Sequence, residues 1–465
     1  MDIRFSHHNS HLENPERFAL TDPHLRRLDA HPFLHRSSLL DSFPIEIPGI
    51  YTLSGGRQVG KTTLMKQWMA HLLRCHVMPE CIAYVTGELI DDQHSLVRLV
   101  DDILQTIPGN TIGYLIIDEV TYIRDWDKGI KYLADAGRLE NIILFLTGSD
   151  LLVIKESRMR LPGRRGSSDL VDFHLYPLNF FETVSLKGCF PSDELQELVE
   201  GETEPGISAL NVLFEAFEGY LQHGGFLTAL NDLARHGSIL PATMATYSDW
   251  IRGDVLKRGK QEHFLREILQ GMLKRYGSQV TWNALCQDLS IDHPKTVADY
   301  IDVLESMDAV FVQKALIEDK LVAAPKKARK LIFTDPFIFH AVRAWLTQAR
   351  DPYQEQVQIL CKDPEGGSRL VESVVVSHYR QYFPTYYIKG AGEVDLAYVD
   401  QQRFWPVEVK WSGQLRPKDL KQITKYHNGR ILTKSLQSGS ILGRPTSPLP
   451  LDLLRLGAQP RPENR

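Results

Sequence analysis

The sequence predicts an α/β protein built from several domains, with a parallel sheet first, a helical region next and a second α/β domain last. Three patterns lead to this prediction. Between Ile50 and about residue 180, apolar strand-like runs alternate with helical stretches, which is typical of a parallel sheet with crossover helices. Residues 205–320 read mostly as helices and include a helix-turn-helix pattern. Farther on, Gly392–Trp411 reads as two strands joined by a polar turn.

The composition is that of a folded protein. Its 465 residues suggest two to four domains of about 150 residues each, and 43% hydrophobic with 24% charged residues argue against a largely disordered chain. The net charge of -5 gives no general basic field, so a nucleic-acid contact needs a local basic patch. Five scattered cysteines without a C-x-x-C pair indicate a reducing compartment and no zinc site. No apolar run reaches the length of about 18 residues that a membrane span needs, so we expect a cytoplasmic protein with no membrane partner.

The chain divides by pattern into five segments. The opening segment shows no clear periodicity, and the closing segment, rich in Pro, Gly and Ser, is expected to be a loose end. The expected segments are an N-terminal lead-in with at most one short helix (1–45), the first α/β domain (46–204), the helical region (205–320), the second α/β domain (321–436) and a C-terminal tail (437–465).

A phosphate-binding loop stands between the first strand and the first helix of the parallel-sheet region. The segment GGRQVGKT matches G-x-x-x-x-G-K-[ST] after the strand IYTLS and before the helix TLMKQWMAHLL. In such loops backbone N–H groups surround a phosphate, the lysine reaches the β- and γ-phosphates and the hydroxyl binds Mg²⁺. A chance glycine-rich turn is the alternative. The pattern predicts ATP and Mg²⁺ as cofactors, with contacts from Gly55, Gly56, Arg57, Gln58, Val59, Gly60, Lys61, Thr62 and Thr63.

A pair of acids supports the nucleotide site. The apolar strand YLIIDEV ends in Asp118 and Glu119. At the carboxyl end of a strand adjacent to the P-loop strand, Asp118 can hold Mg²⁺ and Glu119 can orient the attacking water, as in a Walker B element. A helix-capping acid pair is the alternative interpretation.

Two further groups are candidates to act on the γ-phosphate. The next strand, NIILFLTGSD, ends in small polar residues, and Ser149 is the candidate sensor. Downstream, Arg164 and Arg165 are candidates to stabilise the transition state, within the chain or across a subunit boundary of a homo-oligomer. Solvent-exposed loop arginines are the alternative. The pattern names no adenine-contacting residue.

The helical region ends in a candidate DNA-binding module. Val280–Gln313 reads as a helix, a tight turn, a second helix and a strand, which is the outline of a winged helix-turn-helix. A basic connector follows at Pro325–Lys330. A module that only packs one domain against another is the alternative. Binding to the DNA backbone is expected through Lys295, Lys326, Lys327, Arg329 and Lys330.

The second α/β domain carries a candidate metal site. If residues 401–402 form a two-residue turn, Asp395 lies opposite Glu408, and Lys410 points to the same face as Glu408. Opposed carboxylates repel each other unless a cation lies between them, and Mg²⁺ or Mn²⁺ suits such a pair. Glu372, in a helix-like stretch, can add a third acid. An amphipathic hairpin with a Glu-Lys pair on its wet face is the alternative.

Together these acids and the lysine form an E…D…E-x-K arrangement, which metal-dependent phosphodiesterases use to polarise a phosphate and position water. The expected metal ligands of the whole chain are Thr62, Asp118, Glu372, Asp395 and Glu408. The residues expected to act in catalysis are Lys61, Glu119, Ser149, Arg164 and Lys410.

In combination the motifs resemble prokaryotic AAA-family P-loop ATPases that carry a C-terminal domain of the PD-(D/E)XK, or restriction-endonuclease-like, type. The resemblance covers most of the chain and rests on GGRQVGKTT, LIIDEV, LTGSD, LPGR, HLYPLNFFE, YLQHGGF, TVADYIDVLESM, FTDPFI, GEVDLAYV and VEVKW. It implies an AAA-type ATPase domain, a helical lid with a winged helix, and a nuclease-like domain.

The implied function is ATP-gated DNA processing by a Mg²⁺-dependent nuclease, in genome defence or mobile-element control. A nucleotide-switched DNA-binding or scaffold protein whose nuclease-like domain does not cut is the second hypothesis. An intact set of metal-binding acids distinguishes the two, because cutting requires the cation and binding does not.

Overall fold

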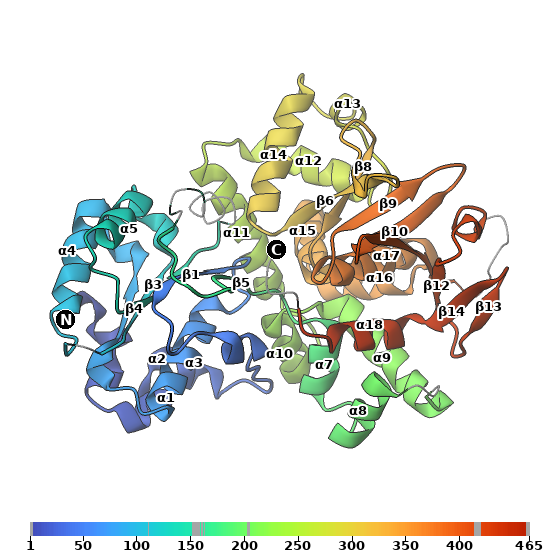
Figure 1. The fold of residues 1–465 in the computed structure, drawn as a ribbon. Coiled ribbons are helices and arrows are strands. Elements are labelled where there is room, and N and C mark those ends of the chain that lie inside the picture. Colours follow the sequence, from blue (N-terminus) through green and yellow to red (C-terminus); the bar gives the residue numbers. More distant parts are fainter. Residues whose placement is uncertain are drawn as a thin grey trace. The chain divides into compact units, whose positions relative to one another are not determined.

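The computed structural model describes residues 3–109, 111–150, 159, 161, 163–201, 205–412 and 420–461. The chain divides into two compact units, Met1–Tyr176 (unit 1) and Pro177–Pro462 (unit 2), and each is described by itself (Figure 1). Within these described ranges, no helix has both the length and the apolar character needed to cross a membrane. The division at residues 176 and 177 falls earlier than the domain boundary expected at residue 204.

Unit 1 is built around a five-stranded parallel sheet, which confirms the α/β prediction for this region (Figure 1). Its order is β2-β3-β4-β1-β5. β4 lies between β1 and β3, so the strand that carries the acid pair is not adjacent to the P-loop strand. This corrects the expectation that the two strands are neighbours. The elements are β1 (Gly49–Ser54), α3 (Lys61–Arg74), β2 (Ile82–Thr86), α4 (Gln93–Leu104), β3 (Gly113–Asp118), α5 (Trp126–Asp135), β4 (Ile142–Thr147) and β5 (Asp172–His174).

Helices cover both faces of this sheet, and this explains why its strands are apolar at consecutive residues. One face packs with Leu96 of α4 and Ile130 of α5, and the other packs with Trp68 of α3, which meets Phe145 of β4 in an edge-to-face contact. Every residue of β3 and β4 is buried.

The N-terminal segment is part of unit 1 and not a lead-in, which corrects the expectation for residues 1–45. It contains α1 (Phe18–Thr21) and α2 (Pro23–Leu28) together with short 3-10 turns. Phe5, Phe18 and Phe43 are buried in the cores of the sheet. Short turns carry no helical or strand periodicity, so the sequence pattern could not show this packing.

The same segment covers the edge of the sheet at β2. The side-chain amide of Asn9 donates to the Tyr84 carbonyl at 2.7 Å and accepts from the Tyr84 N–H at 2.8 Å. One side chain thereby pairs with the edge strand as a neighbouring strand would, which satisfies backbone groups that are otherwise open.

Unit 2 begins with helices, as expected for residues 205–320. The expected boundary at residue 204 does not divide it, because α7 and α8 pack against α18, and α7 also packs against α9. The helices are α7 (Phe180–Lys187), α8 (Ser192–Glu200), α9 (Ile207–His223), α10 (Leu227–His236), α11 (Pro241–Lys257), α12 (Glu262–Lys274), α13 (Trp282–Gln287), α14 (Pro294–Ser306), α15 (Pro336–Thr347), α16 (Gln358–Lys362), α17 (Pro364–Arg380) and α18 (Leu449–Gly457).

A nine-stranded mixed sheet forms the rest of unit 2, in the order β13-β14-β12-β11-β10-β9-β6-β7, with β8 paired to β6 (Figure 1). The expected boundary at residues 320 and 321 falls inside this sheet, because β6 pairs with β9 in parallel and with β8 in antiparallel orientation. The strands are β6 (Val310–Ile317), β7 (Val322–Ala323), β8 (Arg329–Phe333), β9 (Thr385–Lys389), β10 (Glu393–Asp400), β11 (Arg403–Lys410), β12 (Arg430–Thr433), β13 (Gly439–Ile441) and β14 (Arg444–Pro448).

The hairpin of β10 and β11 has the register that the sequence predicts. Asp400 pairs with Arg403, and Leu396 pairs with Val407. The two turn residues, Gln401 and Gln402, have φ values of 46° and 59°, as a two-residue type I′ turn requires.

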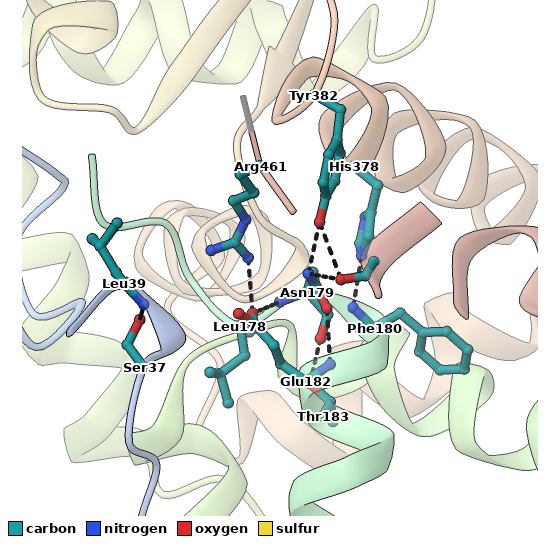
Figure 2. Close-up of polar contacts among 12 residues, drawn as sticks. Ser37, Leu39, Leu178, Asn179, Phe180, Glu182, Thr183, His378, Tyr382 and Arg461 are labelled. Atoms are coloured by element: carbon teal, nitrogen blue, oxygen red, sulfur yellow. Dashed lines mark hydrogen bonds and ion pairs between the residues drawn. The ribbon is translucent and has the colours of Figure 1, made fainter. Parts of the chain in front are cut away.

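The C-terminal segment is packed and not a loose end, which corrects the expectation for residues 437–465 as far as residue 461. Leu449, Leu453 and Leu454 of α18 are fully buried. The end of this helix is fixed by Asn179, whose amide donates to the carbonyl of Gly457 at 3.0 Å. The same amide donates to the Tyr382 hydroxyl at 3.0 Å, as Figure 2 shows. The Pro, Gly and Ser content of this segment suggested a loose tail, but its contacts with the rest of unit 2 hold it in place. Residues 462–465 lie outside the described residues.

Four further hydrogen bonds complete this junction in Figure 2. Asn179 caps α7 by accepting from the Glu182 N–H, and the Glu182 carboxylate accepts from the Asn179 N–H in return. The same carboxylate binds Arg461 at 2.8 Å, and the Phe180 N–H donates to Nε2 of His378 at 3.0 Å. The start of α7 is thereby joined to α17 and to the C-terminal segment.

We expect Leu454→Ala to destabilise unit 2 by about 2–5 kcal/mol, because it removes a fully buried side chain and leaves a cavity. Leu256→Ala is the matched control, since Leu256 lies on α11 with 49% of its surface exposed, and its effect should stay within about 0.5 kcal/mol. Urea unfolding of the full chain measures both. Equal midpoints for the two variants would contradict the packed position of α18.

Candidate functional site

The P-loop connects the carboxyl end of β1 to the first turn of α3. Its backbone requires glycine at two positions. Gly60 has a φ of 105°, which side chains rarely adopt, and a Cβ on Gly55 would lie 2.5 Å from the carbonyl oxygen of Leu175. The loop is therefore shaped by its glycines as the motif predicts.

Lys61 folds back over this loop. Its Nζ donates to the carbonyls of Gly55 at 3.1 Å and Gly56 at 2.9 Å, and lies 3.8 Å from Oε1 of Glu119. Only 5% of Lys61 is exposed. A buried ammonium group held inside a glycine loop is suited to bind phosphate.

Asp118 lies at the centre of a group of hydroxyls. Its Oδ2 accepts from Thr62 at 2.7 Å and from the Tyr84 hydroxyl at 2.5 Å, while its Oδ1 accepts from Thr147. Hydroxyl and carboxylate oxygens are the ligands that Mg²⁺ prefers, so Thr62 and Asp118 fit the expected metal. The sequence pattern did not indicate Tyr84, whose only signal is a polar tip in the apolar strand CIAYV.

Glu119 is held beside Asp118 with a left-handed backbone, at a φ of 52°. Its N–H donates to the Thr147 hydroxyl at 3.0 Å, and its carboxylate accepts from Ser149 at 3.3 Å. The structure thus brings Lys61, Glu119 and Ser149 together, as the sequence predicts.

The remaining P-loop side chains contact neighbouring segments of unit 1. Arg57 donates to the Tyr122 hydroxyl at 3.0 Å. Thr63 lies 2.8 Å from Nε2 of His24, a residue of α2 that the sequence pattern did not indicate.

Arg164 is not brought to the P-loop within this chain, which corrects the role expected for it in cis. It forms an ion pair with Asp135, the last residue of α5. The next residues confirm the location, because a Cβ on Gly166 would lie 2.5 Å from the carbonyl oxygen of Pro48. Pro48 precedes β1, whereas the P-loop follows it, and a six-residue strand separates its two ends by about 16 Å.

In unit 2 the predicted acids gather at one place. Asp395 and Glu408 are buried, and Oδ2 of Asp395 accepts from the Val409 N–H at 2.9 Å. Nζ of Lys410 lies 2.5 Å from Oε1 of Glu408. The other oxygen, Oε2 of Glu408, is buried and has no hydrogen-bond partner in the described parts of the chain.

Burial and mutual repulsion shift the proton equilibria of this acidic cluster. Burial, followed by the charge of Asp395, raises the pKa of Glu372 to about 8 and raises the pKa of Glu408 well above its usual range. Burial disfavours the charge of Lys410, but Asp395 and Glu408 outweigh it, so the pKa of Lys410 is raised.

Lys330 is a member of the acidic cluster and not an exposed DNA contact, which corrects the expectation for this residue. Its side chain is 4% exposed, and its Nζ lies 2.5 Å from Oε1 of Glu393 and 4.0 Å from Oδ1 of Asp395. Arg329 precedes it on β8 and instead lies over the ring of Trp282, at 4.4 Å.

Two lysines therefore lie among the acids and form ion pairs with three of them. Across the described ranges, no group of three or more His, Cys, Asp or Glu side chains is arranged to hold a metal ion. The three-acid arrangement expected for Glu372, Asp395 and Glu408 is not formed, because Lys330 and Lys410 contact the carboxylates. Mg²⁺ needs only one or two carboxylates, and the unpaired oxygen of Glu408 is the feature that suits it.

We expect Lys330→Met to destabilise the chain by about 3–5 kcal/mol, because it leaves buried carboxylates without their partner. Lys327→Met is the control, since Lys327 is exposed in the same connector, and a change within about 0.5 kcal/mol is expected. Thermal unfolding of both variants measures the difference. A silent Lys330→Met would mean that the cluster does not need this lysine.

The geometry of unit 1 is that of a P-loop ATPase: a glycine loop before a helix, a lysine and threonine at its end, and an acid pair that follows a parallel strand. The comparison with protein families agrees. Residues 48–184 match the family described as an AAA domain, and residues 214–349 match a domain of unknown function. The chain thus contains an AAA-type P-loop ATPase domain, and this family implies binding of nucleotide and Mg²⁺.

Similar proteins extend beyond this domain. An uncharacterized protein of Haemophilus influenzae is 24% identical over 270 residues, which span 55% of this chain and 60% of that protein. The Walker-type ATPase PABY2304 of Pyrococcus abyssi is 15% identical with a TM-score of 0.41, covering 65% of this chain and 92% of that one. The ORC2 protein of Aeropyrum pernix is 14% identical with a TM-score of 0.35, covering 67% of this chain and 90% of that one.

Proposed function

We propose that the chain hydrolyses ATP at the P-loop, and that this cycle controls a metal-dependent phosphodiesterase site in unit 2 that acts on DNA. The observation that carries the ATPase half is the convergence of Lys61 and Ser149 on Glu119, beside the Thr62 and Asp118 pair. An ammonium group, hydroxyls and a carboxylate are the groups that bound phosphates, Mg²⁺ and an attacking water require.

Each residue has a defined task in hydrolysis. Lys61 binds the β- and γ-phosphate oxygens, and Glu119 orients the water and accepts its proton. The water oxygen forms a bond to the γ-phosphorus while the bond from that phosphorus to the bridging oxygen of ADP breaks, so ADP and phosphate are released. Thr62 and Asp118 would hold Mg²⁺, which supplies neutralising charge to the phosphates when bound. Arg164 could complete such a site only from another subunit of a homo-oligomer.

The topology of unit 2 supports the nuclease-like assignment. Helix α17 is followed by the antiparallel strands β9, β10 and β11, and then β12 pairs with β11 in parallel. α17 packs against this sheet. Glu372 lies on the helix, Asp395 on the second strand, and Glu408 and Lys410 on the third. This helix-and-strand order, with the acids at the centre, supports a PD-(D/E)XK domain.

At this site Asp395 and Glu408 would hold Mg²⁺ or Mn²⁺, which supplies polarisation of the phosphate when bound. Lys410 would position the water, whose oxygen bonds to phosphorus as the bond to the sugar oxygen of the leaving strand breaks. The proton of the water passes to solvent or to the leaving oxygen. Glu372, which lies within electrostatic range of Asp395 and both lysines, would act as the third acid.

DNA is the proposed partner because a basic and aromatic surface lies near the helix-turn-helix pair. α13 and α14 pack together, Arg329 lies over Trp282 of α13, and Lys326 and Lys327 of the connector are exposed. Basic side chains bind phosphates of either strand, and arginine-aromatic pairs offer a face on which bases can stack.

A second function is favoured by Lys330. Because its ammonium lies among the acids, unit 2 can act as a nucleotide-switched DNA-binding or scaffold domain that does not cut. The two functions share the ATPase and differ only at the acidic cluster.

Incubation of the purified chain with plasmid and linear DNA tests both. Mg²⁺ or Mn²⁺ is supplied with and without ATP, and phosphate release, DNA retardation and strand cleavage are recorded. ATP-dependent cleavage supports the proposed function, and retardation without cleavage supports the second. A chain that releases no phosphate from ATP under any of these conditions would overturn the ATPase half.

A further inference from the structure

Asp118 receives one hydrogen bond that the P-loop motif does not require. Thr62 belongs to the P-loop and Thr147 to the neighbouring strand β4, but Tyr84 lies on β2, at the edge of the sheet. The Tyr84 hydroxyl donates to the same Oδ2 that accepts from Thr62, at 2.5 Å. The orientation of this carboxylate is therefore set partly by a tyrosine outside the motif.

Tyr84 is itself fixed from two sides. The Asn9 amide pairs with its backbone N–H and carbonyl, while Nζ of Lys66 lies 4.2 Å from the centre of its ring. The attraction between a cation and an aromatic ring is strongest when both are removed from water. Tyr84 and Lys66 are each 1% exposed. The tyrosine has little freedom to move away from Asp118.

The N-terminal segment holds Lys66 in place. Nζ of Lys66, on α3, lies 3.1 Å from Oδ2 of Asp22 and donates to the carbonyl of His8 at 2.6 Å. Both side chains of the ion pair are 1% exposed. The other oxygen of Asp22 caps α2 by accepting from the His24 and Leu25 N–H groups. A buried cation is costly unless it is paired, so these contacts fix its position.

We propose that Tyr84 and Lys66 are positioning residues of the nucleotide site, which hold Asp118 toward Thr62 and thereby set the affinity for Mg²⁺ in the nucleotide complex. This inference rests on the proposed binding of ATP and adds a chain of contacts that runs from residues 8–22 through Lys66 and Tyr84 to Asp118. Segments that the motif does not include thus tune the metal requirement.

The energetics favour a measurable effect. Hydrogen bonds to a charged group are stronger than those between neutral groups, so the loss of one of its three donors leaves the Asp118 carboxylate less firmly oriented. Burial and the nearby charge of Asp118 raise the pKa of Tyr84 well above its usual range, so the phenol keeps its proton and remains a donor.

Tyr84→Phe tests the hydroxyl without altering the ring. We measure binding of a fluorescent, non-hydrolysable ATP analogue to the full chain while Mg²⁺ is titrated, and repeat the measurement in EDTA. The Mg²⁺ concentration for half-maximal binding should rise roughly tenfold, whereas binding in EDTA should be unchanged because Lys61 and the loop are intact. A purely structural role would weaken both equally.

The role of Lys66 needs a variant that leaves no unpaired buried charge. Lys66→Met combined with Asp22→Asn removes both charges, and Asn retains the ability to cap α2. The same rise in the Mg²⁺ requirement, of smaller size, is expected.

Four outcomes are informative. Unchanged half-saturation in Tyr84→Phe overturns the inference, and unchanged half-saturation in the double variant alone removes Lys66 from it. Equal weakening with and without Mg²⁺ also overturns it. If the wild-type chain binds no nucleotide at all, the proposed function fails and this inference fails with it.

Discussion

Glu119→Gln is expected to lower the rate of ATP hydrolysis by about 100-fold or more while ATP binding persists, because general-base assistance contributes about 10²–10⁴ in rate. Glutamine has the shape of glutamate but cannot accept the proton of the water. Its amide can still accept from Ser149, which bonds the carboxylate at 3.3 Å. Phosphate release and analogue binding, measured on the same preparation, separate the two effects.

Two further variants test whether the loss of hydrolysis is specific to Glu119. Lys61→Ala should abolish binding itself, because it removes the ammonium that meets the phosphates. Glu88→Gln is the matched control, because Glu88 is an exposed glutamate that follows the carboxyl end of β2, as the P-loop follows the carboxyl end of β1. The rate of ATP hydrolysis by this variant should be unaffected. Wild-type hydrolysis by Glu119→Gln would remove Glu119 from the chemistry and leave Asp118 as the remaining acid of the pair.

Asp395→Asn is expected to remove Mn²⁺ binding at unit 2 and to lower DNA cleavage by about 100-fold or more, because a metal-dependent phosphodiesterase depends on its cation for polarisation. Mn²⁺ binding is measured by calorimetric titration in a Lys61→Ala background. Because this substitution removes nucleotide binding, Mn²⁺ that would bind at the P-loop together with nucleotide does not contribute to the measured heat. Asp319→Asn, at an exposed position after β6, serves as the control. Equal Mn²⁺ binding by the Asp395 and Asp319 variants would remove the metal site and the nuclease hypothesis with it.

Asp395→Asn is also expected to lower the stability of the metal-free protein, which the repulsion between two opposed carboxylates alone does not predict. Repulsion between Asp395 and Glu408 suggests that the metal-free fold is unharmed or slightly stabilised when Asp395 is neutralised. The structure reverses this expectation, because Nζ of Lys330 lies 4.0 Å from Asp395 and Lys410 also acts on it electrostatically. Both lysines lose an attractive partner when Asp395 is neutralised, so the metal-free variant should unfold at a lower temperature than the wild type.

The sequence by itself predicts those parts of the fold whose geometry depends on residues that are close together in the chain. The P-loop could be read because a strand, a glycine loop and a helix follow one another directly. The β10–β11 hairpin could be read because a two-residue turn sets the register of every pair along it, and alternation then places Glu408 and Lys410 on one face. The acids Asp118 and Glu119 follow from a strand that ends where they begin.

Only the tertiary structure decided which distant segments meet. β4 enters between β1 and β3 because strand order depends on crossover connections and not on sequence order. Tyr84 reaches Asp118 from an edge strand, and Lys330 turns from an expected surface contact into a buried partner of the acids. The N-terminal and C-terminal segments are packed by Phe18 and Leu454, although neither the irregular pattern of the first segment nor the Pro, Gly and Ser content of the last indicated this burial. Periodicity reports which side of an element is apolar, whereas the choice of partner depends on packing and charge pairing between residues far apart in the chain.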